Sequence, residues 1–252
     1  MNYENKSLSI EKLLGPKSPE LPAAIWSFIY FFCILGSYYM LRPVRDAMAV
    51  TSGPDTIPFL FAGTFITMLI ATPIFGWVTS RYPRRKFLPW VYYFFISNIL
   101  IFWVLFTYKI DQELDYVWLG RSFFIWVSVF NLYVVSVFWS FMADIYSREQ
   151  SRRLFGIISA GGSSGAIIGG IITSTLTTKI GFQNLLPLSA MLLLISIFAI
   201  TQLKKWVNKQ DTHEIEQSTK FDKSLGGNAF AGITAVFNSK YFFSMAIGSA
   251  IA

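Results

Sequence analysis

Long apolar runs separated by short polar segments dominate this chain. Crossing a hydrocarbon layer about 30 Å thick takes roughly 20 helical residues, and six runs have about that length. They occupy residues 23–41, 57–79, 87–107, 117–142, 154–179 and 182–203. The pattern predicts an all-α membrane protein in which residues 23–203 form a six-helix transmembrane bundle.

Basic residues gather after every second run. Those that follow the second, fourth and sixth runs are Arg81, Arg84, Arg85, Lys86, Arg148, Arg152, Arg153, Lys204, Lys205 and Lys209. Because cytoplasmic loops carry an excess of Lys and Arg, these connections and the N-terminal tail (1–22) are predicted to be cytoplasmic.

The end of the chain predicts a further element. Residues 204–240 mix charges of both signs with a Gly-Gly pair and are expected to form a cytoplasmic linker. A seventh apolar run begins at Tyr241 and stops at Ala252, which is too short to span a bilayer. The expectation is therefore the front part of a longer protein, with the start of a second bundle at 241–252.

Composition removes several classes of function. With 54% hydrophobic and only 14% charged residues, the chain is not a soluble domain, and the net charge of +7 lies in short clusters rather than on a nucleic-acid-binding face. One cysteine and one histidine leave no disulfide and no expected metal or cofactor site. Neither a metalloprotease motif nor a serine–histidine arrangement is present, so no enzyme is expected.

Three ionisable residues, Arg42, Arg45 and Asp46, close the first apolar run. Charge inside a span costs roughly 2.5–3.5 kcal/mol at its centre on the insertion scale, so such residues usually face a cavity or a partner. On a helix the three share one face, and two guanidinium forks suit an anionic, phosphate-like ligand. In the alternative interpretation the first helix ends near Leu41, the charges are interfacial anchors, and Asp46 neutralises Arg42.

Small residues form a ridge in the fifth run. Gly161, Gly165 and Gly169 recur every four residues, which places them on one helix face where another backbone can approach closely. Plain packing explains such a ridge; it also provides a surface along which helices can slide.

Two motifs resemble signatures of the major facilitator superfamily. Residues 76–86 are similar to its loop-2/3 signature, with Ser80 at the usual Asp and Pro83 at the usual Gly. Residues 161–170 are similar to its antiporter signature, with Ala166 at the usual Pro. The resemblance implies the N-terminal six-helix half of that fold, built from inverted three-helix repeats, with a C-terminal six-helix half on the same full-length chain.

A closer resemblance is to the ATP/ADP-exchanger branch of plastids and intracellular bacteria. Residues 38–50 match its motif at the end of helix 1, Y-x-x-L-R-x-x-K-D-x-L-x-V, with Arg45 at the family lysine, and residues 57–60 match the I-P-F-L that follows. This implies secondary transport of a nucleotide or another phosphorylated metabolite, by exchange, in a bacterial inner membrane.

The fourth run carries further polar residues. Arg121, Ser128 and Asn131 share one helix face, and under the facilitator resemblance helices 1 and 4 both line the cavity. Arg121 is then a third cationic contact or, equally, an outer-interface anchor. Asp144, near Arg148 and Arg152, is expected to close an inner salt-bridge gate rather than to bind substrate. Arg81, Arg84 and Arg85, in the loop that resembles the facilitator signature, are expected to serve gating or packing.

The leading hypothesis is a transporter whose substrate pairs with Arg42, Arg45, Asp46, Arg121 and Asn131. A second hypothesis keeps the fold and makes it an exporter of drugs or other small solutes; the aromatic content of 18% favours this slightly, while a cationic site disfavours cationic drugs. A third is a membrane subunit that does not transport. The expected partners are the lipid bilayer and a small anion, with no nucleic acid.

Overall fold

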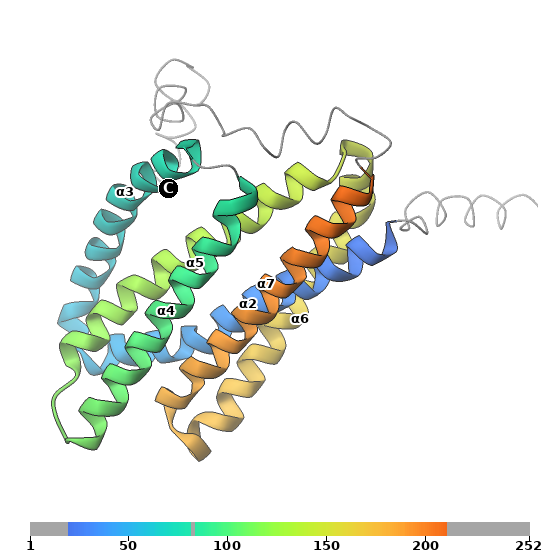
Figure 1. Ribbon diagram of the computed structural model, residues 1–252. Coiled ribbons are helices and arrows are strands. Elements are labelled where there is room, and N and C mark those ends of the chain that lie inside the picture. The colour runs from blue at the N-terminus through green and yellow to red at the C-terminus, as the bar shows by residue number, and fades with distance from the viewer. Residues whose placement is uncertain (1–19, 82–83, 211–252) are drawn as a thin grey trace, which may run out of the picture.

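The computed structural model describes residues 20–81 and 84–210, and these are helical apart from short connections. The long helices are α2 (Leu21–Thr51), α3 (Ile57–Arg81), α4 (Arg84–Asp111), α5 (Val117–Ile145), α6 (Arg148–Ile180) and α7 (Leu185–Gln210). Short 3-10 turns, η1 (Pro54–Thr56) and η2 (Phe182–Asn184), precede α3 and α7. All six long helices are long and apolar enough to cross a membrane. In Figure 1 the connections after α2, α4 and α6 lie at one end of the bundle.

Each predicted run corresponds to one long helix, and the first run differs most from its helix. The apolar run stops at Leu41, whereas α2 continues for ten residues to Thr51. Charged side chains do not break a helix, and Pro43 is accommodated inside it. The helix ends where Gly53 adopts a φ of +90°, which favours glycine, directly before Pro54. The helix end near Leu41 that the alternative interpretation assumed is therefore wrong, while its interpretation of the charges as interfacial anchors is not decided by the end of the helix.

Two predicted boundaries also move. Helix α7 includes residues 204–210 of the predicted linker, so its lysines lie in the last turns of a helix, where positive charge is favourable. Leu21 and Pro22, placed in the N-terminal tail, form the first turn of α2. The rest of the predicted tail and linker, and the predicted seventh helix at 241–252, lie outside the described residues.

The helices form two interlocked groups of three, α2–α4 and α5–α7. Within each group, consecutive helices make few contacts. Instead α2, the first helix of its group, packs on α6, the second helix of the other group, and α5 packs in the same way on α3. The first helix of each group also packs on the third helix of the other group, which gives the pairs α2 with α7 and α5 with α4. The two first helices, α2 and α5, contact each other, and so do the two third helices, α4 and α7. This reciprocity is the contact pattern of inverted three-helix repeats, which agrees with the predicted fold class.

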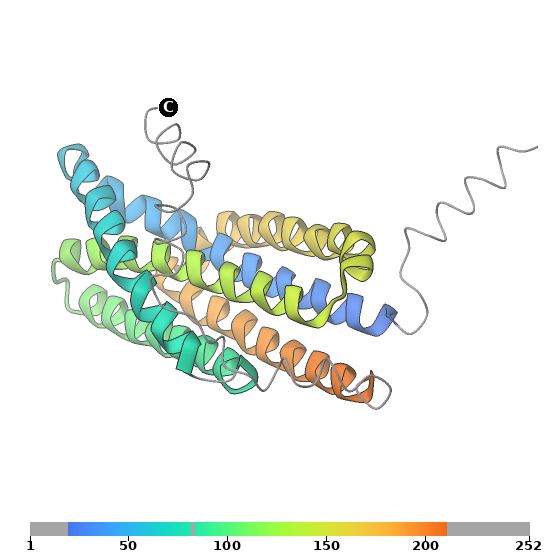
Figure 2. The same cartoon turned by 90° about the horizontal axis from the view of Figure 1, so that it is seen from above.

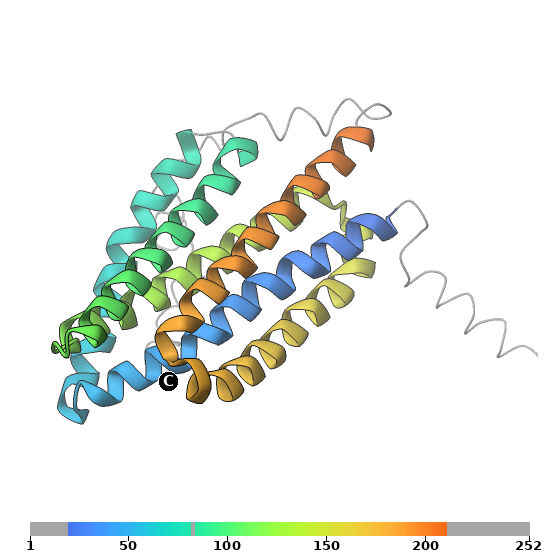
Figure 3. The same cartoon turned by 60° about the horizontal axis from the view of Figure 1, so that its bottom comes forward.

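The closest packing lies between α6 and α2. A Cβ added at Gly161 would lie 2.5 Å from the carbonyl oxygen of Phe28, and one at Gly169 would lie 2.5 Å from that of Gly36. Between them, a Cβ at Gly165 would overlap the carbonyl oxygen of Phe32. Glycine is thus required along this face because the two backbones touch, and the predicted ridge packs on α2. Figures 2 and 3 both show α2 running between α6 and α7.

One register holds along this whole contact. The three glycine contacts, the 3.3 Å hydrogen bond from Thr173 Oγ1 to Met40 O and the ion pair of Arg153 with Glu20 all join residues 133 positions apart. The partners on α2 recur in steps of four from Phe28 to Met40. A spacing of four exceeds the 3.6 residues of a helical turn, so the pair winds with a right-handed crossing, as small-residue ridges favour.

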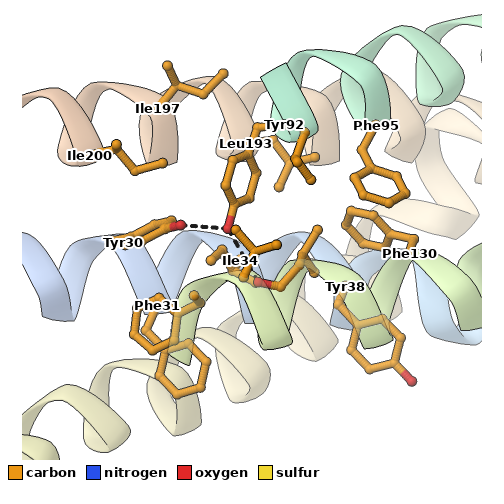
Figure 4. Close-up of a cluster of buried hydrophobic side chains, with 14 of the residues drawn as sticks. Tyr30, Phe31, Ile34, Tyr38, Tyr92, Phe95, Phe130, Leu193, Ile197 and Ile200 are labelled. Carbon is orange, nitrogen blue, oxygen red and sulfur yellow. Dashed lines mark hydrogen bonds between the residues drawn. The ribbon is translucent and has the colours of Figure 1, made fainter. Parts of the chain in front are cut away.

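Buried hydroxyls tie α2 to its other neighbours. Tyr92 donates its single hydroxyl hydrogen to the carbonyl oxygen of Val134. Tyr30 must therefore be the donor in its 2.6 Å bond to Tyr92 Oη, and the two bonds join α2, α4 and α5. Ser37 and Ser189 are bonded at 2.7 Å between α2 and α7. Such bonds contribute about 0.6–2 kcal/mol each in a membrane protein. In Figure 4 the Tyr30 and Tyr92 hydroxyls point toward each other within the hydrophobic cluster.

The ridge predicts a position-specific sensitivity. Gly165→Ala places a methyl group against the α2 backbone, and overpacking of this kind costs about 1–3 kcal/mol. We expect the thermal midpoint of the full-length protein in detergent to fall by roughly 2–10 °C. Gly170→Ala is the matched control, because a Cβ there has nothing within 4 Å. Equal shifts in the two variants would contradict the packing role.

The ion pair at the start of the register predicts a second sensitivity. The side chains of Glu20 and Arg153 are only 6% and 12% exposed, so Glu20→Gln leaves a buried guanidinium without its counter-charge. Breaking a buried pair costs about 3–5 kcal/mol, which detergent unfolding should detect. Glu149→Gln, at an exposed acid in the first turn of α6, is the control, with an expected loss below about 1 kcal/mol. An unchanged Glu20→Gln midpoint would show that the pair does not stabilise the fold.

Candidate functional site

Arg42, Arg45 and Asp46 lie on one continuous stretch of α2, in its last three turns. The helix is about 46 Å long at 1.5 Å per residue, which exceeds a hydrocarbon layer of about 30 Å. If α2 enters the layer at Leu21, the arginines lie near the opposite boundary of the layer. The position of the arginines along α2 therefore does not set them apart from ordinary interfacial residues. Their side-chain contacts, above all those of Arg45 with α5, are the informative feature.

Arg45 is held by contacts on three sides. Its Nε and Nη2 donate to Asp46 Oδ1 at 2.9 and 2.7 Å, and its Nη1 donates to Ser128 Oγ at 3.3 Å. The guanidinium carbon lies 5.0 Å from the centre of the Phe124 ring, a cation–π contact. With its side chain only 17% exposed, Arg45 has a fixed orientation between α2 and α5.

Phe124 and Ser128 are placed by local features of α5. They lie four residues apart and so share a helix face, and Ser128 Oγ donates back to the Phe124 carbonyl oxygen at 3.0 Å. One turn before Phe124, Gly120 lets Met48 of α2 pack closely: a Cβ there would lie 3.1 Å from the Met48 sulfur. The close approach at Gly120 brings Arg45 within reach of α5.

Arg42 is the open member of the pair. Its side chain is 46% exposed, its Nε lies 3.9 Å from Asp46 Oδ2, and its guanidinium lies 5.6 Å from the centre of the Tyr39 ring. The Asp46 carboxylate, 51% exposed, thus lies between both arginines. Arg42 retains hydrogen-bond donors for an incoming anion, because a guanidinium carries five N–H groups.

The structure keeps Arg121 apart from this pair. Its Nη2 donates to Thr56 Oγ1 of η1 at 3.4 Å, and its guanidinium lies 4.6 Å from the centre of the exposed Trp118 ring. Arg121 lies two turns from Ser128, about 10 Å along α5. Asn131, half-buried, lies one turn from Ser128 in the other direction. Both share a face of α5 with Ser128, but no contact joins either to Arg45 within the described residues.

The predicted gate residues lie at the opposite end of the bundle. Arg81 is exposed at the end of α3, with its guanidinium 4.4 Å from the centre of the Trp77 ring. Arg84 and Arg85 begin α4, and their side chains lie outside the described part of the structure. Asp144 is half-buried in the last turn of α5. Gating by these residues stays a prediction.

Sequence reasoning missed the ion pair at this end. Arg153 Nη2 donates to Glu20 Oε1 at 2.8 Å, and Gln150 Nε2 reaches the same oxygen at 3.3 Å. Ser147 and Gln150 also form a capping box that fixes the start of α6. The pattern Ser147-x-x-Gln150 predicts this helix start, and it would have shown that Arg153 lies inside α6.

Nearby, Tyr146 and Ser27 join α5 to α2 through a 2.8 Å hydrogen bond. Burial raises the pKa of Tyr146 to about 12, so the phenol stays neutral and keeps this bond at ordinary pH.

Among residues 20–81 and 84–210, no group of three or more His, Cys, Asp or Glu side chains could hold a metal ion.

Similarity to known proteins agrees with the arrangement of six membrane-length helices. A profile described as Major Facilitator Superfamily, a family of transporters and not of enzymes, matches residues 25–252. The ADP,ATP carrier protein 4 of Rickettsia bellii is 25% identical over 201 residues, which cover 64% of this chain and 38% of the relative. The ADP,ATP carrier protein 2 of Chlamydia pneumoniae is 25% identical over 58% of this chain and 32% of the relative.

The longest of these matches is to the ADP,ATP carrier protein 3 of Rickettsia prowazekii, at 20% identity over 94% of this chain and 57% of the relative. The chain thus spans less than two thirds of the length of these curated relatives. No solved structure matches the chain significantly. The matching profile and the six interlocked membrane-length helices together identify the chain as an integral multi-pass membrane protein that is distantly homologous to ADP,ATP carrier proteins and belongs to the major facilitator superfamily.

Proposed function

We propose that the full-length protein is a secondary transporter that exchanges an anionic phosphorylated metabolite, such as ATP for ADP, by alternating access. In this proposal the chain supplies the N-terminal half, and a C-terminal six-helix half completes the pathway. The two halves rock around the substrate, as in other facilitators.

The arrangement around Arg45 carries this proposal. Arg45 lies near the boundary of the apolar layer, yet its side chain is fixed between α2 and α5 by Ser128 and Phe124 instead of extending freely into water. Arg42 supplies a second guanidinium, which is half-exposed. Two guanidiniums on one helix face match the several oxygens of a phosphate chain better than they match a neutral or cationic solute. Homology to proteins named ADP,ATP carriers supports the same substrate class.

Orientation and gating belong to the same proposal. With the N-terminus in the cytoplasm of a bacterial inner membrane, the arginine pair lies toward the outer end and Arg81, Arg84, Arg85 and Asp144 toward the inner end. In this orientation the inner residues open and close the cytoplasmic side, and the Gly161–Gly165–Gly169 ridge holds α6 on α2. Arg121 and Asn131 extend the polar face of α5 above and below Ser128.

The direct experiment is exchange in proteoliposomes that contain the full-length protein. Labelled ATP, ADP or phosphate is loaded inside, and unlabelled competitors are added outside. We expect nucleotide efflux to be stimulated by external nucleotide. Flux of a lipophilic solute, with no response to nucleotides, would overturn the proposed substrate and favour an exporter of small solutes.

Arginine variants test the site itself. Arg45→Ala and Arg42→Ala should each lower exchange by at least tenfold, because loss of a charged hydrogen-bonding partner costs about 1.5–3 kcal/mol or more. Lys179→Ala removes the same charge from an exposed position at the outer end of α6 and should leave exchange unchanged. Equal protein content in the liposomes controls for insertion. Near-normal exchange by both arginine variants would show that the pair does not bind substrate.

A further inference from the structure

The edge of Arg45 that best suits a phosphate is already occupied. A guanidinium presents Nε and Nη2 as a parallel fork that can bind oxyanions. In this structure both atoms donate to the same oxygen, Asp46 Oδ1, at 2.9 and 2.7 Å. The second carboxylate oxygen, Oδ2, lies 3.9 Å from Arg42 Nε. One carboxylate therefore takes the place between the two arginines that an anionic ligand would need.

This pairing is not a routine consequence of helix geometry. Adjacent residues on a helix point about 100° apart and do not normally face each other. Arg45 contacts Asp46 because its guanidinium lies against the Phe124 ring with Nη1 on Ser128, which turns the fork back toward α2. The packing against α5 thus directs the fork at Asp46.

The two partners differ in their freedom to move. The Arg45 side chain is 17% exposed and is held by α5, whereas the Asp46 side chain is 51% exposed. Asp46 can rotate into water and recover its hydration, while Arg45 would have to leave Ser128 and Phe124. In any exchange of partners, the carboxylate is the group that leaves.

Charge favours that exchange. A carboxylate brings one negative charge and two oxygens, whereas a phosphate chain brings several of each and can reach Arg42 as well as Arg45. The looser Arg42 contact, at 3.9 Å, exceeds hydrogen-bond distance and is lost at little cost. An anion with more charge and more acceptors than Asp46 therefore displaces it.

We propose that Asp46 is an internal counter-ion that occupies the anion-binding fork of Arg45 in the empty site, and that a phosphate-bearing substrate binds by displacing it. This inference rests on the proposed function, because it concerns the same site. It changes the role of Asp46 from a substrate ligand to a competitor of the substrate.

The test is equilibrium binding of ATP and of pyrophosphate to the full-length protein in nanodiscs. Asp46→Asn keeps the shape of the side chain but removes the competing charge, so both probes should bind about tenfold more tightly, in line with measured couplings of close charge pairs. Asp46→Glu retains the competing charge and should not bind either probe more tightly than the wild type does. Thermal midpoints of all variants establish that they fold.

Two controls separate competition from general electrostatics. Asp55→Asn removes the same charge from an exposed position in η1, just beyond α2, and should leave affinity unchanged. In the Arg45→Ala background, Asp46→Asn should produce no tightening, because the fork is absent. Equal tightening by Asp55→Asn and Asp46→Asn would overturn the proposal in favour of a long-range charge effect.

The remaining outcomes separate this inference from the function beneath it. If the wild type binds ATP and Arg45→Ala weakens binding, but Asp46→Asn binds equally or more weakly than the wild type, the counter-ion role is wrong and the proposed function stands. If neither the wild type nor any variant binds either probe, the proposed function fails and the counter-ion role fails with it.

Discussion

Backbone contact between α2 and α6 is the constraint on which the rest of this fold depends. Lipid is as apolar as the side chains, so burying apolar surface gives little drive for helices to associate inside a membrane. Close approach replaces it, and Gly161, Gly165 and Gly169 allow the α6 backbone to touch the carbonyls of α2. Dispersion and weak Cα–H contacts then accumulate over five turns. Helix α2, held this way, becomes the element on which α5 and α7 also pack.

Polar contacts between helices add to the packing that the glycines allow. Each neighbour of α2 receives a specific bond: α4 through Tyr92, α5 through Tyr146, α6 through Arg153 and α7 through Ser189. These bonds fix the rotation of α2 about its own axis, since Ser27, Tyr30 and Ser37 must each face a different helix. The same rotation points Arg45 at Phe124 and Ser128. The geometry of the candidate site thus depends on contacts of Ser27, Tyr30 and Ser37, which lie about two to five turns from Arg45 along α2.

The sequence predicts the elements of this fold better than their partners. Apolar runs placed all six spans, because lipid requires about 20 apolar residues per crossing. The end of α2 was missed, since helix continues past the apolar run through Arg42 and Asp46 until Gly53 and Pro54. A period of four identified the α6 ridge, but nothing local names Phe32 as its partner. Glu20 was placed in the N-terminal tail, and nothing near it in the sequence indicates its counter-charge, Arg153, which lies 133 residues away.

For the candidate site too, the residues could be found from the sequence, while their contacts could not. Arg42, Arg45 and Asp46 were found from the cost of charge at the end of an apolar run, which is a local signal. The fork of Arg45, the ring beneath it and the separation of Arg121 depend on how α2 and α5 are rotated against each other. That rotation is set by the Met48–Gly120 contact and by the interhelical bonds, none of which leaves a pattern along the chain. Local chemistry is therefore predictable here, and the pairing of helices is not.

The single register between α2 and α6 has a mechanical consequence. Five contacts from Glu20 to Met40 share one offset, so a shift of one helix along the other would have to break all of them together. An ion pair at one end and a hydroxyl bond at the other act as stops. Helices α2 and α6 are therefore expected to move together, so that a displacement at the Arg153 end of α6 also moves the arginines near the C-terminal end of α2. Helix α3, whose main partner is α5, has no comparable series of contacts in one register, so within the described bundle it is the helix that its neighbours constrain least.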